Sequence, residues 1–363
     1  MSEQSNDYQI SPSRIIPPLL LTMVPWLYGE AYSDAPCYKE IEYLDDRGEI
    51  RERQDKISDG ACYQIKGQAA FGILRDALRE TETLHDIDAS VINFRNTTAI
   101  LLYRPEQHTV MVAFNATQTF GDKIDGFFRF APTDHALGGR VHRGFYRDFV
   151  KPLDGETLSA ENLTALMEGV LHDYADRVED RPLTVDFTGF CSGGAKAVLA
   201  AGEMIHNGFF ETPDQIHLGD IYTFGSVGYA ESAFVQAIED NIKRLDGNLW
   251  EVQLHGDSLS NLMTKEGWVV SRPMGYEQAG THLYLVPDLD GNGVKMLINP
   301  DQDIIARLPD NDLDMAAAHR PEPYEAVLRA LIGDTPTPEM KTEGKTYEIP
   351  QNCLIREYML EGL

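Results

Sequence analysis

The segment DFTGFCSGGAKAVLAAGEMI, residues 186–205, constrains the fold of this chain more than any other. Its first half is apolar and predicts a buried strand, and its alanine-rich second half predicts a helix. Only a tight glycine turn separates the two, with Cys191 at its tip. In many hydrolases a strand–turn–helix unit of this kind holds a nucleophile in a strained backbone conformation.

The glycine spacing around the turn selects Cys191 as the candidate nucleophile. Strand and helix can approach each other only if the residues two before and two after the nucleophile are small. Gly189 and Gly193 satisfy this for Cys191, whereas Phe190 is too bulky for a frame centred on Ser192. Ser192 is then expected to supply a backbone N–H.

A cysteine is chemically competent at this position. The thiolate is a strong nucleophile, and a helix amino terminus or a histidine favours its formation. The alternative is a glycine turn with an ordinary buried cysteine, since free cysteine is among the most buried residue types. Taken alone, the segment leaves both interpretations open.

Strands and helices alternate through the middle of the chain. We expect an α/β fold with a mostly parallel, doubly wound sheet flanked by helices. The predicted strands cover residues 98–104, 108–117, 183–190, 217–226 and 248–257, and the predicted helices cover residues 161–178, 231–245 and the segment that begins near 192.

The composition limits the classes of partner. The chain has 363 residues, 42% of them hydrophobic, which is enough for a sizeable core. Its 31 basic and 58 acidic residues give a net charge of −27. This charge argues against nucleic acid or an anionic membrane surface as the main partner.

Neither a cofactor nor a metal is predicted. The four cysteines, Cys37, Cys62, Cys191 and Cys353, form no CxxC pair, so we expect reduced thiols rather than a disulfide framework or a zinc site. Residues 288–293, DLDGNG, imitate an EF-hand loop, but Asn299 stands where the bidentate carboxylate belongs. Because the flanking segments read as strands, we predict a hairpin turn there.

The apolar stretch 15–27 is too short to span a bilayer and contains three prolines. We expect it to pack on the domain, and we predict a cytoplasmic protein, with export by a leaderless route left open. The expected division is an amino-terminal extension over 1–90 packed on the core, an α/β domain over 91–335 and a carboxy-terminal tail over 336–363.

Several motifs in order resemble the class 3 lipases, the α/β-hydrolase family that includes the fungal triglyceride lipases. TGFCSGGA stands where the family usually has TGHSLGGA, and VAFNAT stands for VAFRGT. Further similarities are carried by VHRGFYRDF, IYTFGSVG, LHGDSLSNL and AHRPEPYEAVLRAL. The resemblance covers about residues 90–333 and implies the α/β-hydrolase fold.

The same resemblance implies a catalytic triad of Cys191, Asp257 and His319, in the chain order expected of this fold. Asp257 would orient the imidazole of His319, which would take the proton from Cys191 and return it to the leaving group. His142 is expected to be structural. His255 and His282 are the alternative bases.

The resemblance also implies an oxyanion hole formed by the backbone N–H groups of Thr117 and Ser192. Asn115 and Ala116 replace the family's usual Arg and Gly, so this loop is expected to differ in shape. The segment 120–132 matches a lid and part of an acyl groove. The phenylalanines expected to contact substrate are Phe120, Phe127 and Phe128, together with Phe130.

These assignments predict an acyl hydrolase, similar to a lipase or esterase, that acts on a small-molecule or lipid ester through an acyl-thioester intermediate. An acyltransferase or thioesterase with the same triad is an alternative, because a thioester reacts readily with amines and thiols. A non-catalytic binding protein on a lipase scaffold is another. Transient contact with a lipid surface fits the substrate class, and the oligomeric state stays open.

Overall fold

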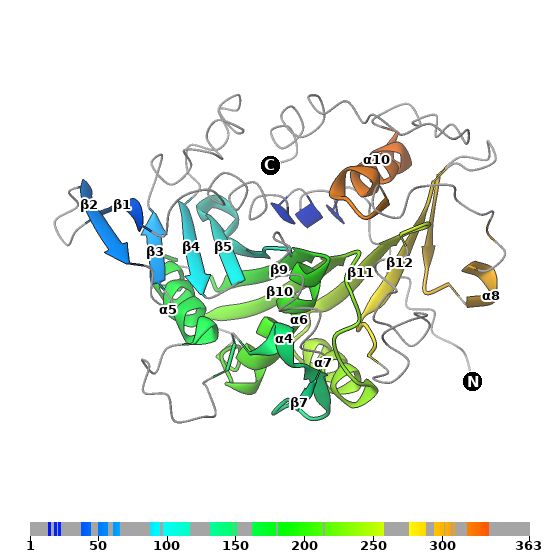
Figure 1. Cartoon of the computed structure of the whole chain (residues 1–363), viewed down its shortest axis with the longest axis horizontal. Coiled ribbons are helices and arrows are strands. Elements are labelled where there is room, and N and C mark those ends of the chain that lie inside the picture. Colours follow the sequence, from blue (N-terminus) through cyan, green and yellow to red (C-terminus); the bar gives the residue numbers. More distant parts are fainter. Residues whose placement is uncertain are drawn as a thin grey trace.

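The computed structural model describes residues 14–15, 18–19, 21–22, 38–44, 50–56, 61–65, 88–94, 97–116, 131–147, 149–150, 162–178, 181–212, 215–257, 276–287, 294–300, 302–305, 308 and 318–333. A nine-stranded sheet in the order β13-β12-β11-β10-β9-β6-β5-β4-β3 forms its centre (Figure 1). In the described part of the chain no helix is both long and apolar enough to cross a membrane.

The centre of the sheet is parallel. The strands β6 (Thr109–Phe114), β9 (Leu183–Phe190), β10 (Ile216–Phe224), β11 (Asn248–Leu254) and β12 (Thr281–Val286) run in one direction. Their apolar runs are buried on both faces, as parallel strands require. The predicted doubly wound α/β sheet, an α/β-hydrolase fold, is confirmed.

Antiparallel strands flank this centre. On one side β5 (Thr97–Arg104) pairs with β6, and β4 (Asp88–Phe94) and β3 (Ala61–Ile65) follow. On the other side β13 (Lys295–Ile298) pairs with β12. The hairpin predicted at 98–117 is therefore present. β12 and β13 pair on either side of residues 288–293, where a hairpin turn is predicted and which lie outside the described residues.

Besides the nine-stranded sheet, the described residues form two separate two-stranded sheets. β1 (Tyr38–Leu44) pairs with β2 (Ile50–Lys56), and β7 (Pro132–Asp134) pairs with β8 (Arg140–His142). A 3₁₀ turn, η3 (Pro105–Gln107), connects β5 to β6.

Helices cover both faces of the sheet (Figure 1). One face carries α4 (Arg143–Tyr146), α5 (Leu163–Ala175), α6 (Ser192–His206) and α7 (Ser232–Arg244). The opposite face carries α10 (Pro321–Ile332), and the short α8 (Gln302–Ile305) lies near β13. Asn162 caps α5 by accepting a hydrogen bond from the backbone of Ala165, which explains the polar start predicted for this helix.

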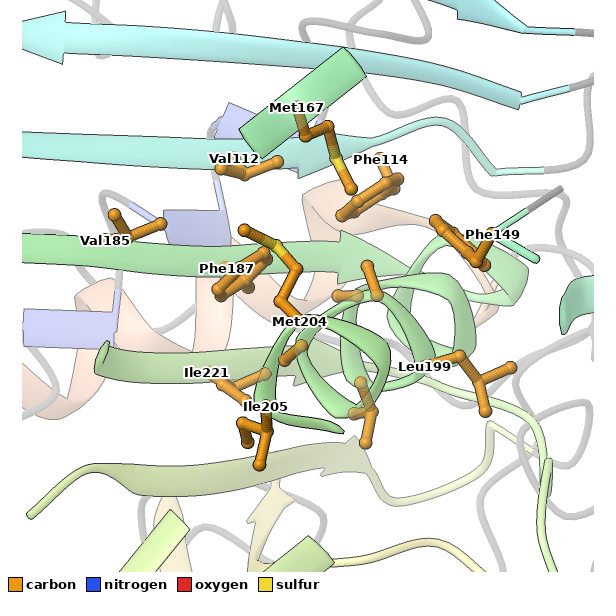
Figure 2. Packing of buried hydrophobic residues seen from close by; sticks show 14 of the residues in the cluster. Val112, Phe114, Phe149, Met167, Val185, Phe187, Leu199, Met204, Ile205 and Ile221 are labelled. Carbon is orange, nitrogen blue, oxygen red and sulfur yellow. The ribbon is translucent and has the colours of Figure 1, made fainter. Parts of the chain in front are cut away.

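Each face has its own apolar core. Figure 2 shows the core under α6, where Phe187 and Ile221 of the sheet pack against Met204 and Ile205. The core under α10 contains Phe224, Trp250 and Leu328. Cys191 packs against both cores, so the tip of the β9–α6 turn lies between the two faces at the carboxyl ends of the central strands.

Residues of the amino-terminal apolar stretch pack in the second core. Ile15, Leu19 and Leu21 are buried there, and the hydroxyl of Thr188 on β9 donates a hydrogen bond to the carbonyl of Pro18 at 3.0 Å. β3 and the start of β4 also lie before residue 91 but belong to the main sheet. The division at residues 90 and 335 stays a proposal.

Candidate active site

Cys191 has the backbone conformation expected at the tip of a nucleophile turn. It lies between β9 and α6 with φ 56° and ψ −124°, a region that residues with a side chain rarely occupy. The cost of this conformation is on the order of 1–3 kcal/mol and is tolerated only where the surroundings enforce it. Its N–H donates to the carbonyl of Phe224 at 2.9 Å, which ties the turn to the end of β10.

The glycines of the turn are required by close backbone contacts. A Cβ atom at Gly189 would lie 2.1 Å from the carbonyl carbon of Gly193. A Cβ at Gly193 would lie 2.6 Å from the carbonyl oxygen of Phe114, and one at Gly194 would lie 2.9 Å from Cβ of Ser226. The glycine pattern in the sequence therefore reports contacts of β9 with α6, and of α6 with the ends of β6 and β10.

His319 and Asp257 are brought together from distant parts of the sequence. Nδ1 of His319 lies 2.9 Å from both carboxylate oxygens of Asp257. Asp257 follows β11, and His319 precedes α10, whose Tyr324 donates a hydrogen bond of 2.5 Å to Asp257. The Asp257 side chain is fully buried, so these bonds stabilise its charge where water is excluded.

The other ring nitrogen of His319, Nε2, is buried and has no hydrogen-bond partner among the described residues. Burial lowers the pKa of His319, but the negative charge of Cys191 and the hydrogen bond with Asp257 outweigh it and raise the pKa to about 10. His319 therefore keeps its proton at neutral pH.

Phe190 replaces the histidine usual in the family's turn motif and contacts the imidazole directly. Its ring centroid lies 5.0 Å from that of His319 and 5.6 Å from that of Tyr324. The Phe190 and His319 rings are tilted by 47° to each other. Phe190 is thus a contact of the candidate base that the glycine spacing alone did not indicate.

The other three histidines considered from the sequence lie in different surroundings. His142 is fully buried, and its Nδ1 accepts a hydrogen bond from the backbone of Phe145 at the start of α4. Nδ1 of His255 lies 3.1 Å from the hydroxyl of Tyr284, and the backbone of His282 donates to Asn299. Among the candidate bases, His319 interacts with both Cys191 and Asp257 in the described part of the chain.

The structure describes one of the two predicted oxyanion donors, Ser192. Ser192 is buried and is the first residue of α6, where N–H groups point out of the helix amino terminus. Thr117 lies outside the described residues, which on this loop end at Ala116. The predicted substrate contacts, Phe120, Phe127 and Phe128 with Phe130, also lie outside them.

A buried polar cluster lies next to Asp257 and was not predicted from the sequence. Glu251 on β11 accepts hydrogen bonds from Thr223 and from the backbone of Ser226. Burial raises its pKa to about 8, against the effect of these bonds. Gln278 donates to the carbonyl of Ser226, so the residue that touches the α6 turn is held on both sides.

The described residues give no support for a metal centre. Among them, no group of at least three His, Cys, Asp or Glu side chains could hold a metal ion. Cys191 is a free thiol. The side chains of Cys37, Cys62 and Cys353 lie outside the described part.

Comparison with known proteins supports the resemblance read from the motifs. Residues 111–266 match the family model "Lipase (class 3)". The resemblance to the class 3 lipases is confirmed. The match includes the β9–α6 turn and Asp257 and ends before His319. No curated protein sequence matches the chain.

Several solved lipase structures are similar at low identity. A lipase from Rhizopus microsporus var. chinensis is 15% identical, covers 85% of each chain and has a TM-score of 0.47. Lipase II from Rhizopus niveus is 16% identical over 61% of this chain and 74% of that chain, with a TM-score of 0.42. A triacylglycerol lipase from Penicillium expansum is 17% identical over 64% and 85%, with a TM-score of 0.41. Similarity at this level carries no functional inference.

Proposed function

We propose that this chain is an acyl hydrolase that cleaves a lipid-like ester, with Cys191 as nucleophile, His319 as acid and base, and Asp257 as the orienting carboxylate. The observation that carries the proposal is the position of His319. Its Nδ1 is held by Asp257, while the charge of Cys191 and this hydrogen bond raise its pKa to about 10. The class 3 lipase match supports the ester as substrate class.

The reaction balances with these groups alone. The Cys191 thiolate attacks the ester carbonyl carbon, so that a carbon–sulfur bond forms and the carbonyl electron pair moves to oxygen. The oxyanion collapses, the carbon–oxygen bond to the alcohol breaks, and His319 gives its proton to the departing alcohol. Water then attacks the thioester with His319 as base, which releases the acid and restores the thiolate and imidazolium.

The oxyanion donors and the acyl groove belong to the same proposal. The N–H groups of Ser192 and Thr117 would stabilise the oxyanion, and Phe120, Phe127 and Phe128 would contact the acyl chain. The family resemblance supports these assignments, and the position of Ser192 at the start of α6 supports its share.

Transfer to another acceptor is the second candidate function, and the cysteine itself favours it. A thioester is more reactive toward amines and thiols than an oxygen ester. Thiolate is also a good leaving group, so the adduct of an alcohol ester can collapse back to substrate. The same residues would then serve an acyltransferase or a thioesterase.

The test compares wild type with Cys191→Ala, Cys191→Ser and Ser192→Ala. Each is given esters and matched thioesters of graded chain length, in water and with alcohol, amine and thiol acceptors. We expect an acyl adduct on Cys191 in the intact mass of the wild type and no turnover by Cys191→Ala. Turnover that persists in Cys191→Ala would exclude the proposed nucleophile, and the preferred acceptor separates hydrolase from transferase.

A further inference from the structure

Lys196 is a buried lysine on the first turns of α6, five residues after Cys191. Only 7% of its surface is exposed. An ammonium group is costly to bury unless hydrogen bonds replace its water shell. A lysine in the alanine-rich first turns of a buried helix therefore calls for a specific partner.

That partner is the first residue after β6. Nζ of Lys196 donates to Oδ1 of Asn115 at 3.1 Å and to the backbone carbonyl of Asn115 at 3.3 Å. Asn115 is fixed from its other side by β5, because its N–H donates to the carbonyl of Thr98 and its Oδ1 accepts from the N–H of Thr98. The side chain and backbone of Asn115 thus link the sheet to the helix.

The link lies beside the contact between the turn and the end of β6. A Cβ at Gly193 would lie 2.6 Å from the carbonyl oxygen of Phe114 and 3.1 Å from that of Asn115. Backbone therefore packs on backbone at this point. Lys196 holds the same segment three residues further along the helix, and Thr117 follows Asn115 by two positions.

We propose that Lys196 is a positioning residue that fixes Asn115, just after β6, against the start of α6. It thereby holds the backbone around the Ser192 N–H, a geometry on which stabilisation of the oxyanion depends steeply. The inference rests on the proposed function.

The test separates oxyanion stabilisation from thiol reactivity. Single-turnover acylation of Cys191 by an activated ester passes through an oxyanion, whereas its alkylation by iodoacetamide does not. We expect Lys196→Met to slow acylation by about 10- to 100-fold, with KM changed less than about threefold and alkylation unchanged. Lys196→Arg keeps donors for Asn115 and should recover most of the rate. Lys243→Met, an exposed lysine on α7, is the matched control.

Equal acylation by Lys196→Met and wild type overturns the inference. Acylation and alkylation that fall together overturn it as well, because Lys196 would then act on the thiolate or on the fold. If Lys196→Met does not fold, Asn115→Ala breaks the link from its other end and is judged by the same two rates. A wild type that is alkylated but never acylated removes the proposed function itself, and a wild type that is acylated with no effect of either variant removes Lys196 alone.

Discussion

His142 is fully buried and the side chain of His319 is only 10% exposed, yet their charge states are opposite. At His142 burial lowers the pKa to about 4, and the ring stacks on Phe145 at 4.1 Å between centroids. At His319 the charge of Cys191 and the hydrogen bond with Asp257 overcome burial and raise the pKa to about 10. One ring is a neutral helix cap and the other is an imidazolium.

The contrast teaches that burial alone does not set the charge state of a histidine. A buried imidazole without a carboxylate stays neutral, because the low-dielectric interior penalises its charged form. The same ring between a carboxylate and a thiolate keeps a proton that it can deliver. The two regions can therefore be compared by matched substitutions.

The largest expected difference is between His319→Gln and His142→Gln. We expect His319→Gln to lower kcat/KM by about 10³- to 10⁴-fold, because the leaving group loses its acid and the thiolate its counterion. His142→Gln can still accept a hydrogen bond from Phe145, so its kcat/KM should stay within about threefold while its melting temperature falls. Steady-state kinetics on the best ester substrate and thermal unfolding give both values. Equal losses of kcat/KM in His319→Gln and His142→Gln would contradict the different roles given to the two histidines.

Asp257→Asn is expected to have the next largest effect. Asn keeps the shape but not the charge, so the imidazolium is less favoured and its orientation less secure. We expect a loss of about 10- to 100-fold in kcat/KM, smaller than at His319 because the thiolate still attracts the proton. Tyr324→Phe removes only one hydrogen bond to the same carboxylate and serves as the milder control. A loss at Asp257→Asn no larger than at Tyr324→Phe would argue that charge is unimportant there.

Asp257 and Glu251 are two buried carboxyl groups that differ in the same way as the two histidines. Asp257 has an imidazolium partner, whereas burial raises the pKa of Glu251 to about 8 from an ordinary value of 4.5. A carboxyl whose folded-state pKa is raised makes the protein less stable as pH rises from the unfolded pKa toward the folded one. We therefore expect Glu251→Gln to gain stability over wild type by about 1 kcal/mol per pH unit between pH 5 and 7.

The measurement is denaturant unfolding of both proteins across this pH window. Glu106→Gln, at an exposed glutamate of η3, is the control and should show a constant difference. A constant difference at Glu251→Gln as well would mean that Glu251 ionises at an ordinary pH.

The sequence predicted the parts of the site that are local. The glycine spacing of 189–194 reports backbone contacts within one strand–turn–helix unit, and it selected Cys191 correctly as the strained residue of the turn. Asp257 and His319 could be paired only through ordered family motifs, because 62 residues separate them. Their hydrogen bond was not visible in composition or periodicity.

The buried charges were missed for a related reason. Lys196 lies in a helix and Glu251 in a strand whose neighbours look apolar, so each resembles an isolated polar residue in the sequence. Their partners are Asn115, just after β6, for Lys196 and Thr223, on β10, for Glu251, and they meet only in the folded protein. The sequence nevertheless contained a sign of these contacts. A single charged residue within an otherwise apolar helix or strand needs a partner when it is buried, and Lys196 and Glu251 are both of this kind.

The smallest expected effect is on the alkaline limb of the pH–rate profile. If His319 delivers its proton from a state with pKa about 10, kcat/KM should fall to about half its plateau near pH 10 and decrease further above it. Asp257→Asn removes a charge that favours the imidazolium, so its limb should move to lower pH. The nearby Tyr324 phenol does not interfere, because burial raises its pKa well above the ordinary value. The profile is measured in the range where circular dichroism shows the fold intact, and an alkaline limb at the same pH in both proteins would mean that a group other than His319 controls it.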